Sequence, residues 1–363
     1  MARILLLSAY HSASHQYWAD GLLKSFPEHV WTVRTQPARH FSWRVRASGW
    51  QWALGEDEAF YQTYDLIIAT SLTQLAPLKA LCPAFRDTPV WVYFHENQFA
   101  HPLGARQKKD HQVGWQFQSM QNAILADAIS FNTEWNRSSF FQGAEKLLRA
   151  FPEKLPMAKW NQLKEQADCL PVPLTEEGGF DLVTKEPHLI VWNHRWEWDK
   201  QPEIFLQALV LLAQEGMPFQ LAMLGSGGGR KNALERYRNQ LADRIVHWGE
   251  ADPVSYRKYL ARASVGVSTA AHDFQGLGIL ELAQAGARVV VPRRLAYPEM
   301  LPGACFYEGC SQNPDQEICN LRGVLREVLS QGESQGPGLV SQTPHWGRWK
   351  APYADKILSL AFA

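Results

Sequence analysis

The chain has 363 residues, of which 46% are hydrophobic and 20% are charged. Its 36 lysines and arginines balance 36 aspartates and glutamates, so the formal net charge at pH 7 is zero. This length predicts two domains with separate cores, and the composition is typical of a soluble globular protein. The charge balance excludes an overall basic excess of the kind that many nucleic-acid binders show, but a local basic face stays open.

The apolar runs of the N-terminal half predict buried parallel strands, because longer mixed segments separate them in a βαβ rhythm. These runs cover residues 3–8, 65–70, 90–94 and 128–132. The pattern starts again in the C-terminal half, with runs at 188–192, 219–224, 245–248, 265–268 and 288–291. The sequence therefore predicts an α/β protein with two doubly wound sheets.

The prolines and polar residues between the two halves mark a hinge. The segment 170–173 reads Leu-Pro-Val-Pro and leads into a glycine-containing stretch at 175–179, which cannot continue a helix or a central strand. We predict an N-terminal domain at 1–174, a C-terminal domain at 175–345, and a final helix at 346–363 that packs back toward the N-terminal domain.

Cysteine usage and the N-terminus bear on the compartment. The five cysteines form no CxxC pair, which favours neither a disulfide framework nor a zinc ribbon. The apolar stretch at 4–7 is too short for a signal peptide, and no run reaches the length that spans a membrane. We expect a cytoplasmic protein without stable membrane insertion.

A glycine-bearing segment at 272–281 follows the strand predicted at 265–268 and enters a helical pattern. A helix N-terminus of this kind binds anions, so the amides near Gly276 are expected at a phosphate. Glu281 is expected to accept the ribose hydroxyls, and Asp273 the hydroxyls of a sugar. The predicted donor-binding residues here are Asp273, Phe274, Gln275, Gly276, Leu277 and Glu281. The alternative is an ordinary connection in which the glycines serve packing and the acids favour the helix N-terminus.

Two cations, Arg195 and Lys200, follow the strand predicted at 188–192. Ligands bind at the carboxyl ends of strands in open α/β sheets, so we predict that these two side chains clasp a pyrophosphate. The alternative is a surface salt-bridge cluster with the acids of the same loop. Further donor contacts are predicted for Asn193 in this loop and for Gly225 and Ser226 in the glycine run after the next strand, although a glycine run alone is weak evidence.

The residues between 31 and 52 interleave aromatic and cationic side chains, as do surfaces that stack bases and neutralise phosphates. They are Trp31, Arg34, Arg39, His40, Trp43, Arg44, Arg46, Trp50 and Trp52. A second basic loop contains Arg106, Lys108, Lys109 and His111. The alternative is a solvated helix with buried tryptophans.

His95 follows the strand predicted at 90–94 and is expected to bond the donor sugar or to orient an acceptor hydroxyl; the alternative is a satisfied loop histidine. Ser14 and His15, after the first strand, are expected to line the nucleotide-sugar or acceptor site. His95 and His101 are six residues apart and cannot share a helix face as an HExxH zinc motif requires, so we expect no bound metal.

These motifs resemble known enzymes. Arg195 with Lys200, followed by the 273–281 segment, resemble the signatures of retaining GT-B glycosyltransferases related to glycogen synthases and bacterial mannosyltransferases. The N-terminal half resembles the tRNA-queuosine α-mannosyltransferases, and that resemblance spans nearly the whole chain. It rests on Ser14-His15 and on the stretches 37–46, 93–98 and 131–133. One departure is Asp273, which stands where the wider family usually has the longer Glu.

The resemblance implies a GT-B fold, in which two Rossmann-like domains face each other across a cleft. It also implies retaining transfer of mannose from GDP-mannose to queuosine in an aspartate tRNA, with the departing phosphate taking the acceptor proton. Bond cleavage builds negative charge on the pyrophosphate, so Arg195 and Lys200 are predicted to be catalytic, together with His95. The predicted acceptor-side residues are Ser14, His15, Glu96, Asn97, Gln98, Asn132, Arg39, Arg44 and Arg46. No cofactor is expected besides the nucleotide-sugar substrate.

Two other functions fit parts of the sequence. A glycosyltransferase of the membrane surface, acting on a lipid or an envelope glycan, would use the mixed apolar and basic stretch at 140–154 as an interfacial helix. Pro152 and Pro156 interrupt that stretch. A non-catalytic module that binds tRNA or sugar would keep the fold without turnover, but the presence of both cations and of Glu281 argues against it.

Overall fold

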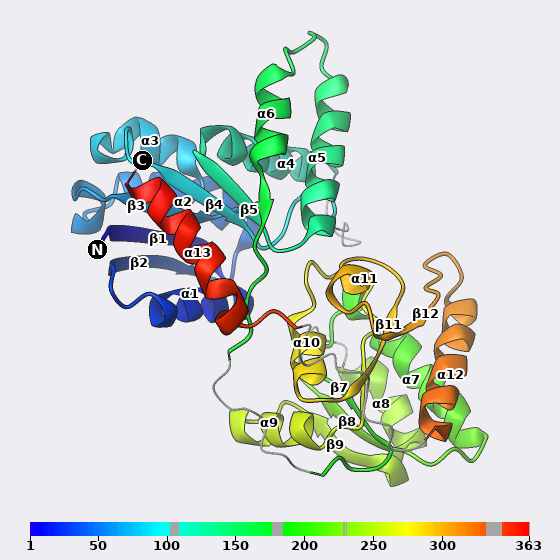
Figure 1. Ribbon diagram of the computed structural model, residues 1–363. Coiled ribbons are helices and arrows are strands. Elements are labelled where there is room, and N and C mark those ends of the chain that lie inside the picture. Colours follow the sequence, from blue (N-terminus) through cyan, green and yellow to red (C-terminus); the bar gives the residue numbers. More distant parts are fainter. Residues whose placement is uncertain (102–108, 176–183, 228, 230, 332–342, 363) are drawn as a thin grey trace. The chain divides into compact units, whose positions relative to one another are not determined.

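The computed structural model describes residues 1–101, 109–175, 184–227, 229, 231–331 and 343–362 (Figure 1). The chain divides into two compact units: Met1–Thr175 with Pro344–Ala363, and Glu176–Thr343. Most of the glycine-containing stretch predicted as a hinge lies outside the described residues. So do Arg106 and Lys108 of the predicted second basic loop, together with the side chains of Lys109 and His111.

The first unit is built on a six-stranded parallel sheet in the order β2-β1-β3-β4-β5-β6. Its strands are β1 (Arg3–His11), β2 (Val30–Pro37), β3 (Leu66–Thr70), β4 (Val90–Phe94), β5 (Ala128–Phe131) and β6 (Asp168–Cys169). Every residue of β3 and β4 is buried, as expected for central parallel strands that helices cover on both faces.

The helices of the first unit connect these strands, except for the C-terminal α13 (Figure 1). They are α1 (Ala13–Ser25), α2 (Phe41–Ala53), α3 (Leu75–Leu81), α4 (Lys109–Leu125), α5 (Glu134–Arg149), α6 (Ala158–Gln166) and α13 (Trp346–Ala361), with the short 3-10 turns η1 (Glu58–Tyr61) and η2 (Pro83–Phe85). The last helix packs on α1. Its buried Tyr353 accepts a hydrogen bond from Trp18 Nε1 at 3.0 Å, and Trp346 lies so close to Gly21 that a Cβ there would be 2.7 Å from the indole nitrogen.

The second unit contains another six-stranded parallel sheet, in the order β12-β11-β10-β7-β8-β9. Its strands are β7 (Leu189–Trp192), β8 (Gln220–Leu224), β9 (Ile245–Gly249), β10 (Val265–Val267), β11 (Arg288–Pro292) and β12 (Cys305–Tyr307). Its helices are α7 (Pro202–Gln214), α8 (Lys231–Gln240), α9 (Pro253–Arg262), α10 (Leu277–Gln284), α11 (Tyr297–Met300) and α12 (Pro314–Ser330), with 3-10 turns η3 (Trp198–Lys200) and η4 (Ala242–Arg244).

The predicted fold class is confirmed, and all nine predicted strands are present. The sequence did not reveal β2, which is a half-exposed edge strand without a continuous apolar run. Trp31 and Arg34 belong to this strand and not to an open basic surface. Trp31 Nε1 donates to Phe26 O at 2.9 Å, and Arg34 forms an ion pair with Asp57. The strands β6 and β12 were missed because they are only 2 and 3 residues long.

The interpretation of residues 140–154 as a membrane-surface helix is wrong, because the apolar side chains at the start of this stretch pack inside the protein. Phe140 and Phe141 on α5 are fully buried in the core of the first unit, and Leu147 and Leu148 pack against the same core. These four side chains therefore pack in the core and do not form a membrane-binding face. No helix within the described ranges is long and apolar enough to cross a membrane.

In each sheet the strand order reverses at one point, and ligands of open α/β sheets bind at the carboxyl ends of the strands beside that point. In the first unit the reversal falls between β1 and β3. In the second unit it falls between β7 and β10. The loops after β7 and β10 contain Asn193, Arg195, Lys200 and residues 273–276, which the sequence singled out.

Candidate functional site

Lys200 lies at the end of the loop that follows β7 and reaches into the loop that follows β10. Its Nζ is 2.6 Å from the carbonyl oxygen of His272, 3.3 Å from Asp273 Oδ2 and 3.6 Å from Asp199 Oδ2. The backbones of the two loops are also joined, because the hydroxyl of Thr269 donates to the carbonyl of Lys200 at 2.7 Å. The switch point thus holds a partly buried cation between carboxylates.

Asp273 connects this cation to the start of α10. Its Oδ1 accepts a hydrogen bond from the amide of Gly276 at 3.0 Å, and its Oδ2 lies 3.3 Å from the Tyr297 hydroxyl. Burial by itself raises the pKa of Asp273, but the charges of Lys200, His194 and His272 outweigh burial and leave the pKa below its ordinary value. The carboxylate is therefore ionised at neutral pH.

Gly276 is required by its conformation and its surroundings. Its φ of 83° lies in the left-handed region, and a Cβ would stand 2.8 Å from the ring of Tyr297. Glycine adopts this conformation without strain and leaves room for the tyrosine ring at the start of α10. Anion binding at this helix N-terminus stays a prediction.

Glu281 lies one turn into α10 and is held by a tyrosine that the sequence did not reveal. The Tyr256 hydroxyl on α9 donates to Glu281 Oε2 at 2.6 Å, and Asn193 Nδ2 lies 2.9 Å from the same hydroxyl. Asn193 Nδ2 also donates to the carbonyl of Gly278 at 2.8 Å. Burial raises the pKa of Glu281, and the hydrogen bond from Tyr256 and the charge of Arg257 offset this only in part.

Arg195 is exposed beside the glycine loop that follows β8. Its one ion pair among the described residues is with Glu197, at 3.9 Å. Gly225 packs directly on the neighbouring backbone, since a Cβ there would be 2.3 Å from His194 O, and the carbonyl of Ser226 accepts from the amide of Trp196 at 3.2 Å. The loops after β7 and β8 are therefore in contact, as the donor-site prediction requires.

The other residues predicted in the 272–281 segment line its interior. Phe274 and Gln275 are buried, and the Phe274 ring packs edge-on against His272 with centroids 4.7 Å apart. Leu277 is half-buried at the start of α10. Their contact with a donor stays a prediction.

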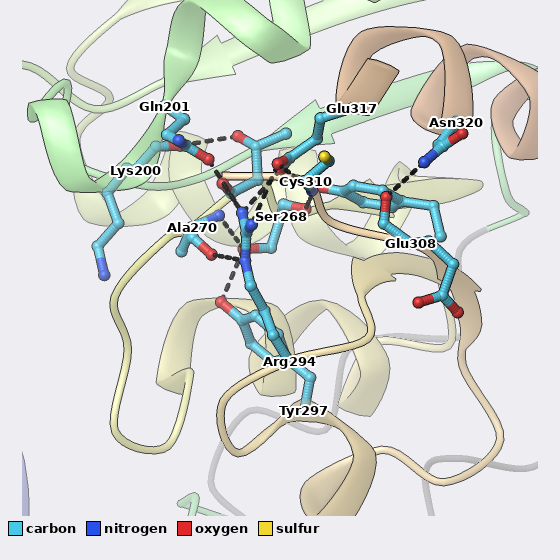
Figure 2. Close-up of polar contacts among 12 residues, drawn as sticks. Lys200, Gln201, Ser268, Ala270, Arg294, Tyr297, Glu308, Cys310, Glu317 and Asn320 are labelled. Atoms are coloured by element: carbon cyan, nitrogen blue, oxygen red, sulfur yellow. Dashed lines mark hydrogen bonds and ion pairs between the residues drawn. The ribbon is translucent and has the colours of Figure 1, made fainter. Parts of the chain in front are cut away.

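Arg294 fastens both loops of the switch point to α12, as Figure 2 shows. Its guanidinium donates to the carbonyls of Thr269 and Ala270 at 3.1 and 3.0 Å and to Gln201 Oε1 at 2.9 Å. It also forms a bidentate ion pair with Glu317, with N···O distances of 2.8 and 3.2 Å. The side chain of Glu317 is 0% exposed. Local sequence patterns could not reveal this pair, because its members are on different elements and only the fold brings them together.

In the first unit His95 is buried among aromatic rings. The centroid of its ring lies 4.2 Å from that of His15, 4.6 Å from Tyr93 and 4.8 Å from the nearer Trp18 ring. Neither ring nitrogen of His95 has a hydrogen-bond partner within the part of the chain that the structure describes. Burial and the neighbouring histidines His15 and His11 hold the pKa of His95 well below its ordinary value, so the ring is neutral. This is not a satisfied loop histidine.

Amide side chains hold the loop that presents His95. Asn132 Nδ2 donates to the carbonyl of His95 at 2.9 Å, and Asn97 Nδ2 donates to Asn136 Oδ1 at 2.8 Å. Asn97 Oδ1 accepts from the amides of Phe99 and Ala100, both at 2.9 Å. Asn97 and Asn132 thus support the loop from within.

The remaining acceptor-side predictions lie near the same strand ends. The carbonyl of Glu96 accepts from Ser71 Oγ at 3.2 Å, and Gln98 is buried, with its carbonyl accepting from Gln116 at 3.2 Å. Ser14 is exposed in the first turn of α1. His15 Nδ1 is 2.6 Å from the carbonyl of Tyr10. Whether these side chains touch an acceptor stays a prediction.

Among the described residues, no group of three or more His, Cys, Asp or Glu side chains is placed to hold a metal ion.

Comparison with known proteins adds the identity of the fold and of the family. Residues 3–174 match the family model described as the N-terminal part of tRNA-queuosine alpha-mannosyltransferase, and residues 187–316 match the model of glycosyl transferases group 1. The chain is 28% identical over 345 residues to the tRNA-queuosine alpha-mannosyltransferase of Drosophila melanogaster, a match that covers 90% of each chain.

Solved structures agree on the architecture. Sucrose-phosphate synthase from Thermosynechococcus elongatus superposes with a TM-score of 0.70 at 12% identity, covering 99% of both chains. The lipopolysaccharide outer core galactosyltransferase WaaB gives a TM-score of 0.64 at 11% identity, covering 98% of this chain and 99% of the other. The fold and the group 1 domain define a glycosyltransferase of the GT-B class. Within that class, residues 3–174 match the tRNA-queuosine alpha-mannosyltransferase family, and the chain is similar to its Drosophila melanogaster member over 90% of its length.

The buried ion pair between Arg294 and Glu317 yields a prediction about stability. Replacing Glu317 by Ala leaves the guanidinium of Arg294, which is 18% exposed, without its counter-charge. Removing one partner of a buried pair costs about 3–5 kcal/mol, so we expect the free energy of unfolding in urea to fall by that amount. The matched control is Glu308→Ala, which breaks the exposed pair of Glu308 with Arg293 and should cost at most about 1 kcal/mol. Equal losses in the two variants would contradict the proposed importance of the buried pair.

Proposed function

We propose that this protein transfers mannose from GDP-mannose to queuosine in the anticodon of an aspartate tRNA, with retention of the anomeric configuration. The observation that carries the proposal is the 28% identity to a tRNA-queuosine alpha-mannosyltransferase over 90% of both chains. The family model over residues 3–174 supports it, because that is the half expected to select the acceptor. The geometry of the second unit supports the donor half of the reaction.

The pyrophosphate of the donor is proposed to bind between the loops that follow β7 and β10. Lys200 stands there, 3.3 Å from Asp273, and α10 begins beside it with the amide of Leu277, since the amide of Gly276 already donates to Asp273 Oδ1. Arg195 is exposed in the same loop and is free to swing toward a phosphate. As the glycosyl–phosphate bond breaks, the negative charge on the leaving pyrophosphate grows, and the positive charges of Lys200 and Arg195 stabilise it.

The ribose and the sugar of the donor are assigned to two acidic residues of the 273–281 segment. Glu281 is proposed to accept both ribose hydroxyls, and Tyr256 and Asn193 fix its position through their shared hydrogen bonds. Asn193 Oδ1 is buried without a protein partner among the described residues, so it is an additional acceptor for a ligand. Asp273 is proposed to hold sugar hydroxyls, since it is ionised and already oriented by Lys200 and Gly276.

His95 is proposed to bind the reacting sugar or the acceptor hydroxyl. A neutral imidazole offers one donor and one acceptor, and both nitrogens of His95 are buried without a protein partner within the described ranges. A buried polar group left without a partner costs free energy, so a ligand hydroxyl would satisfy it. Ser14 and His15 are proposed to complete this side of the reaction.

The proposed reaction needs no metal ion, because Arg195, Lys200 and the N-terminus of α10 supply the positive charge that the leaving pyrophosphate requires. The departing phosphate takes the proton of the attacking hydroxyl, so no protein group acts as a base. A tRNA acceptor also implies that the protein works in the cytoplasm.

The first test is the transfer itself. Purified protein is incubated with queuosine-containing tRNA and GDP-mannose, and the digested nucleosides are weighed by mass spectrometry. We expect queuosine to become heavier by one hexose, and we expect no change in the same tRNA without queuosine. Parallel reactions with UDP and ADP sugars identify the donor. If folded protein adds no hexose with any nucleotide-sugar, the tRNA assignment fails.

A second test removes the cations. Arg195→Ala and Lys200→Ala should each lower kcat about 100-fold or more, the scale at which a charge-stabilising group contributes to a transition state. The control is Arg238→Ala, which removes an exposed arginine of α8 that pairs only with Glu235 among the residues described. Near-normal turnover of the first two variants would remove these cations from the mechanism.

A third test concerns metal. Turnover after dialysis against a chelator such as EDTA should equal turnover before it, and added magnesium or manganese should leave kcat unchanged. Loss of activity on chelation, restored by one of these ions, would show that the charge on the pyrophosphate is neutralised by a metal and not by Arg195 and Lys200.

A further inference from the structure

Helix α2 of the first unit presents a row of large side chains to solvent. Trp43 is 74% exposed, Trp50 is 49% exposed, and Leu54, just past the end of the helix, is 71% exposed. Arg46 is exposed between the two tryptophans. The positions 43, 46, 50 and 54 recur at helical spacing, so these four side chains form one continuous stripe.

The orientation of this stripe is fixed by the opposite face of the helix. Val45 is buried with Leu72 and Trp115 in a small cluster of its own. Gly49 packs so closely on the next segment that a Cβ would be 2.3 Å from the carbonyl of Gln74. The helix cannot rotate about its axis without breaking these contacts, and Trp43 and Trp50 therefore stay outside.

Exposed tryptophans in this arrangement indicate a binding surface. Single apolar side chains are common on protein surfaces, but two indoles on one helix face with an arginine between them are a contiguous patch of the kind that marks an interaction site. Trp52 on the same helix is buried, as an ordinary core tryptophan would be. Tryptophan is thus a core residue on one face of α2 and a solvent-exposed residue on the other.

The charge of the helix indicates the kind of partner. From Arg39 to Gly55 the sequence contains no acidic residue. Arg39, Arg44 and Arg46 form no ion pair among the described residues, although Arg44 donates to the neutral Gln51 at 3.3 Å. The positive face is uncompensated in a chain whose net charge is zero, so it attracts an anionic partner.

The N-terminus of α2 lies at the carboxyl edge of the sheet. Pro37 at the end of β2 pairs with His11 at the end of β1, and the ring of Phe41 packs edge-on against Tyr10 at a centroid distance of 5.3 Å. His15 follows the same end of β1. The stripe therefore starts beside the edge to which the acceptor hydroxyl is assigned, and it leads away from that edge.

We propose that Trp43, Arg46 and Trp50 bind the unpaired nucleotides next to the modified base, with the indoles stacking on bases and the arginines contacting phosphates. This inference rests on the proposed function, since the tRNA is the acceptor there. The seven steps from Trp43 to Trp50 rise roughly 10 Å along the helix, which matches about three stacked nucleotides at roughly 3.4 Å each. Base stacking on aromatics is indifferent to sequence, as suits a contact outside the reacting nucleoside.

The test separates tRNA binding from catalysis. In the double variant Trp43→Ala/Trp50→Ala we expect the KM and Kd for queuosine-containing tRNA to rise about tenfold or more, the scale of losing stacked aromatics. We expect the KM for GDP-mannose and kcat to stay within about twofold of the unchanged protein. Trp43→Phe/Trp50→Phe keeps a stacking ring and should restore most of the affinity. Phe362→Ala, which removes an exposed aromatic at the chain end, is the control.

Arg46→Gln tests the phosphate contact. Plotting log Kd for tRNA against log salt should give a slope smaller by about 0.7–0.9 than that of the unchanged protein, because one counterion fewer is released. Equal urea midpoints for all variants confirm that they are folded, as expected for substitutions of exposed side chains.

The outcomes distinguish this inference from the proposed function. If the unchanged protein adds no hexose to tRNA, the proposed function fails, and this inference fails with it. If the unchanged protein is active but the double variant keeps its KM and Kd for tRNA, the α2 surface is overturned and the function stands. If the double variant keeps its affinity for tRNA but loses a complex with another protein, the inference is likewise overturned, and the α2 surface binds a protein partner.

Discussion

The ion pair of Lys200 with Asp273 is the constraint on which the donor site depends. The two residues come from the loops after β7 and β10, the strands between which the order of the sheet reverses. Parallel strands end at one edge, so these loops meet there, and a cation and a carboxylate placed in them neutralise each other in a partly buried setting. Breaking the pair would leave one charge buried and alone, which is costly. The pair therefore fixes the loops before any ligand binds.

Other contacts extend that constraint outward. The carboxylate of Asp273 accepts a hydrogen bond from the amide of Gly276 and so determines how α10 begins. Arg294 ties the backbone of the loop after β10 and the side chain of Gln201 to the buried Glu317. Preorganisation of this kind is what stabilisation of a transition state requires, because groups already in place need not reorganise as charge develops. Tyr256 does the same for Glu281 through a direct hydrogen bond, and Asn193 in turn donates to the Tyr256 hydroxyl.

Asp273 and His95 are accommodated by opposite electrostatic means. In the second unit the charge of Lys200 compensates that of the partly buried Asp273, and the pKa of Asp273 stays low for that reason. The first unit buries a neutral imidazole among aromatic rings, where the low pKa of His95 excludes a positive charge. A cationic site suits a diphosphate and a neutral one suits sugar hydroxyls, so the division matches the two halves of a glycosyl transfer.

The sequence by itself determined the fold class, the central strands and the resemblance to a family. Apolar runs such as 90–94 identify central strands because both faces of a parallel sheet are buried, and the segment 273–281 could be placed in the connection after one of them. The tertiary structure alone decided which distant side chains meet. Nothing local links Tyr256 to Glu281 or Arg294 to Glu317, and the basic stretch at 31–52 divided only when β2 formed and α2 buried one of its faces. Periodicity records which side of an element is buried, whereas contacts between elements depend on how the whole chain packs.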